Sequence, residues 1–72
     1  MTVNRETAER VRDTCMRFRS EMRDAHPAVE ASSTPEELAR INYVLSRVFH
    51  HLHGKVLEQI YAEHPDLRVE NW

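Results

Sequence analysis

The spacing of apolar residues constrains this chain more than any other feature of its sequence. From about residue 5 to residue 25, apolar side chains recur at intervals of three and four, which places them on one face of an α-helix. This first stripe consists of Ala8, Val11, Cys15, Phe18, Met22 and Ala25. A second stripe with the same spacing consists of Leu38, Ile41, Leu45, Val48, Leu52, Val56 and Ile60. The sequence therefore predicts two amphipathic helices and an all-α fold.

The residues before each stripe are typical of helix starts. Thr2 or Asn4 can accept a hydrogen bond from the first turn of the first helix. Thr34 is placed to cap the second helix, with Pro35 at its first position and Glu37 completing a capping box. Both helix starts are therefore predicted from side chains that satisfy exposed backbone N–H groups.

The helix ends are predicted from two His-Pro pairs, at residues 26–27 and 64–65. Proline has no backbone N–H and crowds the preceding turn, so it favours the end of a helix. We expect helices over residues 5–25 and 35–64, joined by about eight residues as an antiparallel hairpin. Residues 66–72 form a short tail, and residues 1–72 make a single domain.

Gly54 is the only glycine and lies inside the second predicted helix. Glycine costs about 1 kcal/mol there relative to alanine, so a break at this position is one alternative. Leu52, Val56 and Ile60 keep the same helical phase across the glycine. We therefore predict one continuous helix.

The chain is short, and a lone core of this size is marginally stable. Cys15 is the only cysteine, so no disulfide can form within the chain. The second predicted helix is longer than the first, about 45 Å against about 32 Å, and its final turns would overhang. These considerations predict a homodimer that forms a four-helix bundle. The alternative is a monomer whose tail, through Leu67, Val69 and Trp72, covers the overhang.

Helix two carries a second stripe beside the first, running through Tyr43, Ser46, His50, His53, Leu57, Ile60 and His64. A helix that is amphipathic on two adjacent faces usually contacts two neighbours. From this stripe, the overhang and the tail we predict an interface formed by Tyr43, His50, His53, Val56, Leu57, Ile60, Tyr61 and Trp72.

The histidines offer an alternative, a metal- or ligand-responsive protein. His50 and His53 are three residues apart and share a helical face, and His64 lies further along the same stripe. Two imidazoles on one helix make half of a metal site, and the sequence has no motif that supplies the other half. His50, His53 and His64 are therefore weak metal candidates, and no cofactor is predicted.

A further alternative is nucleic-acid binding through Arg5, Arg12 and Arg19, which form a row along the first helix. Acidic residues on the same helix nearly cancel this charge, and the chain has a formal net charge of −2. A dedicated nucleic-acid binder is usually strongly basic, so nucleic acid is not expected as a partner.

The sequence contains none of the motifs that would indicate catalysis, so an enzyme is not expected. No stretch is apolar enough to cross a bilayer, and the first residues do not resemble a signal peptide, which favours a soluble cytoplasmic protein. The predicted function is a small protein–protein interaction module, namely a regulator, an inhibitor or an accessory subunit. Its contacts are predicted on the surface of helix two.

Overall fold

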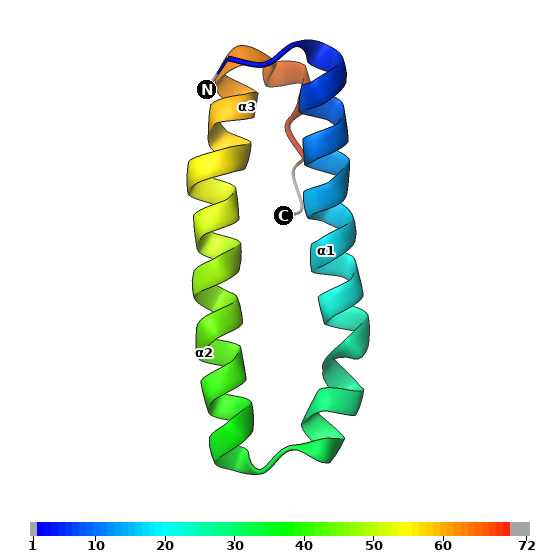
Figure 1. Ribbon diagram of the computed structural model, residues 1–72, viewed down its shortest axis with the longest axis vertical. Helices are drawn as coiled ribbons and strands as arrows, with labels where there is room; N and C mark the ends of the chain where they lie inside the picture. Colours follow the sequence, from blue (N-terminus) through cyan, green and yellow to red (C-terminus); the bar gives the residue numbers. More distant parts are fainter. Residues whose placement is uncertain (1, 70–72) are drawn as a thin grey trace.

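In the computed structural model, which describes residues 2–69, the chain is an antiparallel helical hairpin (Figure 1). The first arm is one helix, and the second arm contains a π-helical turn between two α-helical parts. A short 3-10 turn follows the second arm. The elements are α1 (Arg5–Ser32), α2 (Pro35–His51), η1 (Leu52–Leu57), α3 (Glu58–Glu63) and η2 (Pro65–Leu67). The molecule measures 43 × 18 × 18 Å.

The predicted caps are confirmed at the start of each arm. The Asn4 side chain accepts a hydrogen bond from the backbone N–H of Thr7 at 2.8 Å, so Asn4 is the cap of α1. At α2 the Thr34 hydroxyl accepts from the backbone N–H of Glu37 at 3.1 Å, and the Glu37 carboxylate accepts from the backbone N–H of Thr34 at 3.0 Å. Pro35 occupies the first turn, as predicted.

The predicted end of the first helix is wrong. Pro27 lies inside α1, which continues to Ser32. An interior proline removes one backbone hydrogen bond, but the residues after it, Ala28 to Ala31, include good helix formers that carry the helix on. The helix ends where the Ser33 hydroxyl donates to the carbonyl of Val29 at 2.6 Å. This carbonyl would otherwise accept the next backbone hydrogen bond of the helix, so the hydroxyl competes for it. The second His-Pro pair does end its helix, since α3 stops at Glu63.

The longer first helix removes the predicted overhang. α1 has 28 residues, and α2, η1 and α3 have 17, 6 and 6. Only Ser33 and Thr34 connect the two arms, which therefore have nearly equal lengths. The prediction that the last turns of helix two extend beyond helix one is wrong.

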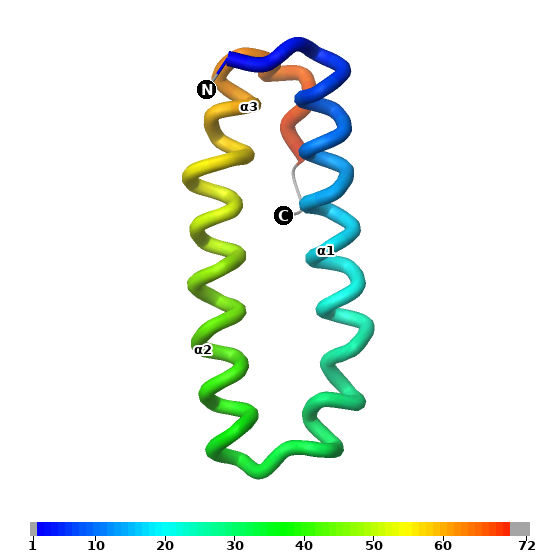
Figure 2. The backbone as a smooth tube through the Cα atoms, in the orientation of Figure 1, coloured from blue at the N-terminus to red at the C-terminus, as the bar shows by residue number. Residues whose placement is uncertain are grey.

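The core lies at the end of the hairpin where residues 2–4 and η2 meet, which we call the terminal end. Its buried residues are Ala8, Cys15, Leu57, Ile60, Tyr61 and Leu67. The segment after α3 turns back along α1, visible in Figure 2, and buries Leu67 against the two arms. The alternative in which the tail covers the end of helix two therefore holds for Leu67. Val69 is half-buried, and Trp72 lies outside the described residues.

The turn η1 shifts the helical phase with which the second arm faces α1. The backbone N–H of Glu58, the residue after η1, donates to the carbonyl of His53, five residues earlier. The turn therefore contains one residue more than an α-helical turn. Before η1, Phe49 packs on Phe18 of α1 with ring centroids 5.5 Å apart. At the end of η1, the buried residue is Leu57 rather than the half-buried Val56. The face toward α1 therefore passes from Phe49, which stands on neither predicted stripe, to Leu57 of the second stripe, and the arm continues through Gly54 without a break.

Candidate interaction surfaces

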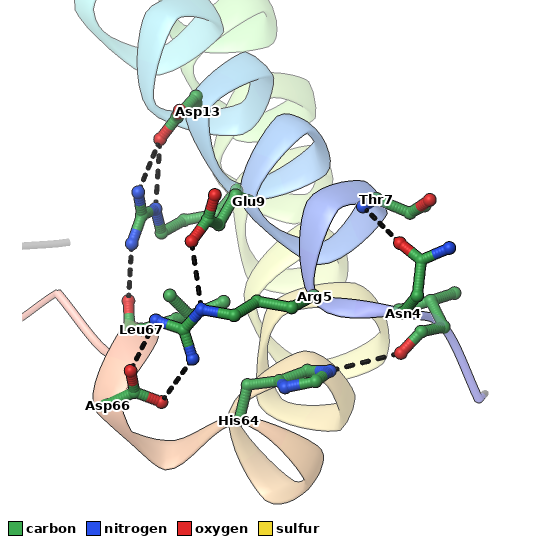
Figure 3. A network of polar contacts seen from close by, with 10 residues as sticks. Asn4, Arg5, Thr7, Glu9, Asp13, His64, Asp66 and Leu67 are labelled. Carbon is green, nitrogen blue, oxygen red and sulfur yellow. Dashed lines mark hydrogen bonds and ion pairs between the residues drawn. The ribbon is translucent and has the colours of Figure 1, made fainter.

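Polar contacts close the terminal end (Figure 3). The Arg5 guanidinium donates to both carboxylate oxygens of Asp66, at 3.1 and 2.5 Å. The His64 imidazole lies 3.1 Å from the carbonyl of Val3, whose N–H donates to Glu63 at 3.1 Å. The hydrogen bonds and positive charge of Arg5 lower the pKa of Asp66. This end of the molecule is already engaged in contacts within the chain.

The arginine row predicted as a possible nucleic-acid surface is largely engaged in these contacts. Arg5 binds Asp66 and also Glu9, the latter at 3.1 Å. Arg12 pairs with Asp13 at 2.9 Å and approaches the carbonyl of Leu67 at 3.4 Å. Two of the three arginines therefore hold the tail against α1 or pair with neighbouring carboxylates.

A second polar network is built on the π-helical turn. The His53 imidazole lies 2.9 Å from the carboxylate of Glu58, five residues later, a spacing that η1 brings onto one face. Arg68 donates to both oxygens of the same carboxylate, at 2.8 and 2.9 Å, and lies over the Tyr61 ring at 4.8 Å. Hydrogen bonding to Arg68, helped by its charge and by His53, lowers the pKa of Glu58 to about 2.

The three weak metal candidates do not converge. The His64 imidazole contacts the Val3 carbonyl at the terminal end, and the His53 imidazole contacts the Glu58 carboxylate. His50 is exposed on the side of α2. Over residues 2–69, no group of three or more histidine, cysteine or acidic side chains is arranged to hold a metal ion.

The half of the hairpin near Ser33 and Thr34, which we call the turn end, has no comparable core. All residues of α2 are described, and none of them is buried. Large apolar side chains remain exposed, at 37% for Phe18, 42% for Ile41, 50% for Val44 and 39% for Val48. On α2 these residues follow the three-four spacing and share one face. We call Phe18, Ile41, Val44 and Val48 the apolar face.

A groove runs between α1 and α2 at the turn end and is lined by a neighbouring stripe of α2 that includes Asn42, Ser46 and Phe49. Its volume is about 780 Å³, within the range of ligand and peptide sites. None of the four apolar-face residues lines it. The turn end therefore has two distinct surfaces, the apolar face and this groove.

The predicted interface residues are divided between the core and the surface. Leu57, Ile60 and Tyr61 are at most 2% exposed in the single chain, so the premise that a monomer leaves them exposed is wrong. Val56 is half-buried beside them, and Trp72 lies outside the described residues. The remaining three are surface residues; His50 and His53 line the groove, and Tyr43 is 63% exposed.

Sequence reasoning missed the apolar face because it assigned Ile41 and Val48 to the contact with helix one. The available signal was the width of the apolar region on helix two: Val44 lies beside the stripe, three residues from Ile41 and four from Val48. An apolar sector this wide exceeds what one neighbouring helix covers.

No protein-family model, curated protein or solved structure matches the chain. Within residues 2–69 no helix combines the length and the apolar character needed to cross a membrane.

Proposed function

We propose that this protein is a small interaction module that pairs with a second copy of itself through the apolar face, forming a four-helix bundle, and serves as a regulator, inhibitor or accessory subunit. One observation carries the proposal: α2 is amphipathic over its whole length, yet no residue of it is buried in the single chain. In a four-helix bundle each helix contacts two neighbours, whereas each arm of a lone hairpin has one.

The exposed area of the chain is large for its mass. A folded monomer of 8.5 kDa is expected to expose about 4,650 Å². This chain exposes 5410 Å², an excess of about 750 Å². A stable interface of standard size buries about 800 Å² on each partner. The excess is comparable in size to one side of such an interface, although the elongated shape of the hairpin also contributes to it.

The charges beside the apolar face favour a second copy as the occupant. Glu21 follows Phe18 by three residues on α1, and Arg40 and Arg47 lie four before and three after Val44 on α2. A two-fold axis that places α1 of one copy against α2 of the other brings Glu21 toward these arginines. The charges beside the face are thus compatible with a second copy as its occupant.

Sedimentation velocity at micromolar concentrations tests the proposal. Wild type should sediment as a dimer, and its melting temperature should rise with protein concentration. Val44→Glu should give a folded monomer, because Val44 is half exposed in the single chain. Ala39→Glu is the control: Ala39 is exposed on α2 and, five residues before Val44, lies on another side of the helix, so this variant should remain a dimer. Leu57→Glu is unsuitable because it would place a charge in the core.

A wild type that sediments as a monomer of 8.5 kDa at all concentrations would refute the dimer. Loss of the dimer in both variants alike would place the interface elsewhere on α2.

A further inference from the structure

The groove at the turn end has an apolar floor. Met22 of α1 and Leu45 and Phe49 of α2 line it, and Pro27 adds a ring from α1. Leu45 and Phe49 are four residues apart, so they stand one above the other along the groove. The floor offers a narrow apolar strip rather than an enclosed cavity.

The α1 rim of the groove is basic. Arg19 and Arg23 stand on it, one helical turn apart, and His26, which pairs with Glu30 at 3.7 Å, lies beyond them. His50 and His53 stand on the opposite side, and the His53 imidazole is paired with the Glu58 carboxylate at 2.9 Å. Among the described residues that line the groove there is no aspartate or glutamate. An apolar strip beside this basic rim is complementary to an apolar ligand that carries negative charge along one edge.

We propose that the groove binds an acidic amphipathic helix of a partner protein. Apolar side chains of that helix would pack on Met22 and Leu45, and a carboxylate on its edge would pair with Arg23. Arginine suits this role because its planar guanidinium binds a carboxylate through two parallel hydrogen bonds. The basic rim excludes a basic helix by like-charge repulsion.

The shape of the groove favours a helix over a small molecule. The wall from Arg19 to Pro27 is about 12 Å long and the wall from Asn42 to His53 about 16 Å, which corresponds to two or three helical turns. The groove is open along this length between two antiparallel helices. A third helix in such a groove completes a three-helix arrangement, the usual helix-in-groove mode of recognition.

This site is separate from the proposed dimer contact, because the apolar face and the groove are lined by different residues of α2. In a dimer formed through the apolar face, each copy keeps its groove accessible. Binding in the groove and self-association can therefore be measured independently.

The test uses two synthetic peptides of about 14 residues, roughly four helical turns, with blocked ends and a fluorescent label. Both carry leucines at intervals of three and four. One has glutamates beside the leucines and the other has lysines at the same positions. Fluorescence anisotropy with the full chain should show saturable binding of the acidic peptide and at least about tenfold weaker binding of the basic one. Circular dichroism should show the acidic peptide gaining helix on binding.

Variants of the full chain locate the site. Arg23→Glu should weaken binding of the acidic peptide at least about tenfold, because it replaces a paired charge with a repelling one. Ser46→Glu, on the opposite wall, should weaken it as well. Arg17→Glu is the matched control on the same helix; Arg17 does not line the groove and should leave binding unchanged. All three positions are on the surface, and circular dichroism should confirm that each variant folds.

Equal affinity for the two peptides would overturn the proposal, and so would loss of binding in Arg17→Glu to the same extent as in Arg23→Glu. Dissociation of the dimer by the acidic peptide would also overturn it, because the groove would then be the self-association contact. A monomeric wild type that binds the acidic peptide would refute the dimer and leave the groove site standing.

Discussion

At the scale of single residues, the burial of Cys15 at the terminal end determines the chemistry of its thiol. Cys15 lies in the core on α1 and is 7% exposed. Burial raises the pKa of its thiol, so little of the reactive thiolate is present at neutral pH. The sequence predicted this position correctly, because Cys15 stands on the apolar stripe between Val11 and Phe18.

We expect Cys15 to be structural and unreactive. A thiol reagent such as a disulfide dye should label the native chain slowly and the urea-unfolded chain rapidly. Cys15→Ala should lower the free energy of unfolding by about 1 kcal/mol through a small cavity. The control is Cys15→Ala combined with Thr14→Cys, since Thr14 is exposed and its replacement should react at once. Fast labelling of native wild type would contradict the prediction.

The Glu58 carboxylate provides a second prediction at this scale, concerning acid. Its pKa is lowered from 4.5 to about 2 by Arg68 and His53. A lowered pKa in the folded chain means that ionised Glu58 stabilises the fold above about pH 4.5 and loses this effect as the pH falls toward 2. We expect NMR titration to show the Glu58 carboxylate ionised well below pH 4.5.

Two variants test the cause of this shift. Arg68→Gln should return the Glu58 pKa most of the way to 4.5, because Arg68 is its main partner. Glu58→Gln should remove the acid-dependent change in the chemical shifts of Arg68. Titration of wild-type Glu58 at 4.5 would mean that the ion pair contributes nothing in solution.

At the scale of elements, the two prolines of the arms occupy opposite situations. Pro35 stands in the first turn of α2, where its missing N–H has no helical partner in any case. Pro27 stands inside α1, where an N–H would donate to the carbonyl of Arg23. The helix therefore continues past Pro27 although one backbone hydrogen bond is lost there, and the other interactions of α1 offset that loss.

We expect Pro27→Ala to stabilise the protein by up to about 3 kcal/mol, because it restores this hydrogen bond and removes the crowding of the proline ring. Pro35→Ala is the matched control and should change stability by less than about 1 kcal/mol. Urea unfolding at one fixed protein concentration measures both. A destabilised Pro27→Ala variant would indicate that the proline is needed for the packing of α1.

These elements also show what the sequence could and could not predict. The caps at Asn4 and Thr34 were predictable, since capping depends on residues within one turn. The end of α1 was not, because local rules treat His-Pro alike at 26–27 and 64–65 and do not weigh the helix formers that follow Pro27. The register change at η1 was also not predictable, because several sides of the second arm form a sound helical face and tertiary packing selects among them.

At the scale of the whole molecule, the hairpin is well packed at one end and open at the other. Its radius of gyration of 14.5 Å exceeds the roughly 11 Å expected for a compact chain of this length. All six core residues belong to the terminal end, whereas the turn end carries the apolar face and the groove. The width of the apolar region on helix two could have indicated the apolar face, but the groove could not be located from the sequence alone, because its position follows from this asymmetry.

This asymmetry predicts a regional response to dilution. Backbone amides of residues 57–63 should exchange slowly with deuterium at any protein concentration, because their packing lies within one chain. Amides of residues 41–49 should exchange faster as the protein is diluted and the dimer dissociates. Mass spectrometry of peptide fragments at two concentrations measures both regions, and Val44→Glu should abolish the dependence. Concentration-independent exchange of residues 41–49 in wild type would argue against the dimer.

The π-helical turn also has a consequence for how this chain could change in evolution. A turn with one extra residue is equivalent to a single insertion in an α-helix. A chain that lacked one residue within 52–57 would form a regular helix and still present Phe49 and Leu57 to α1. A gap of two residues would rotate Leu57 and Tyr61 out of the core. Descendants of the same fold should therefore differ in length here by one residue or by none.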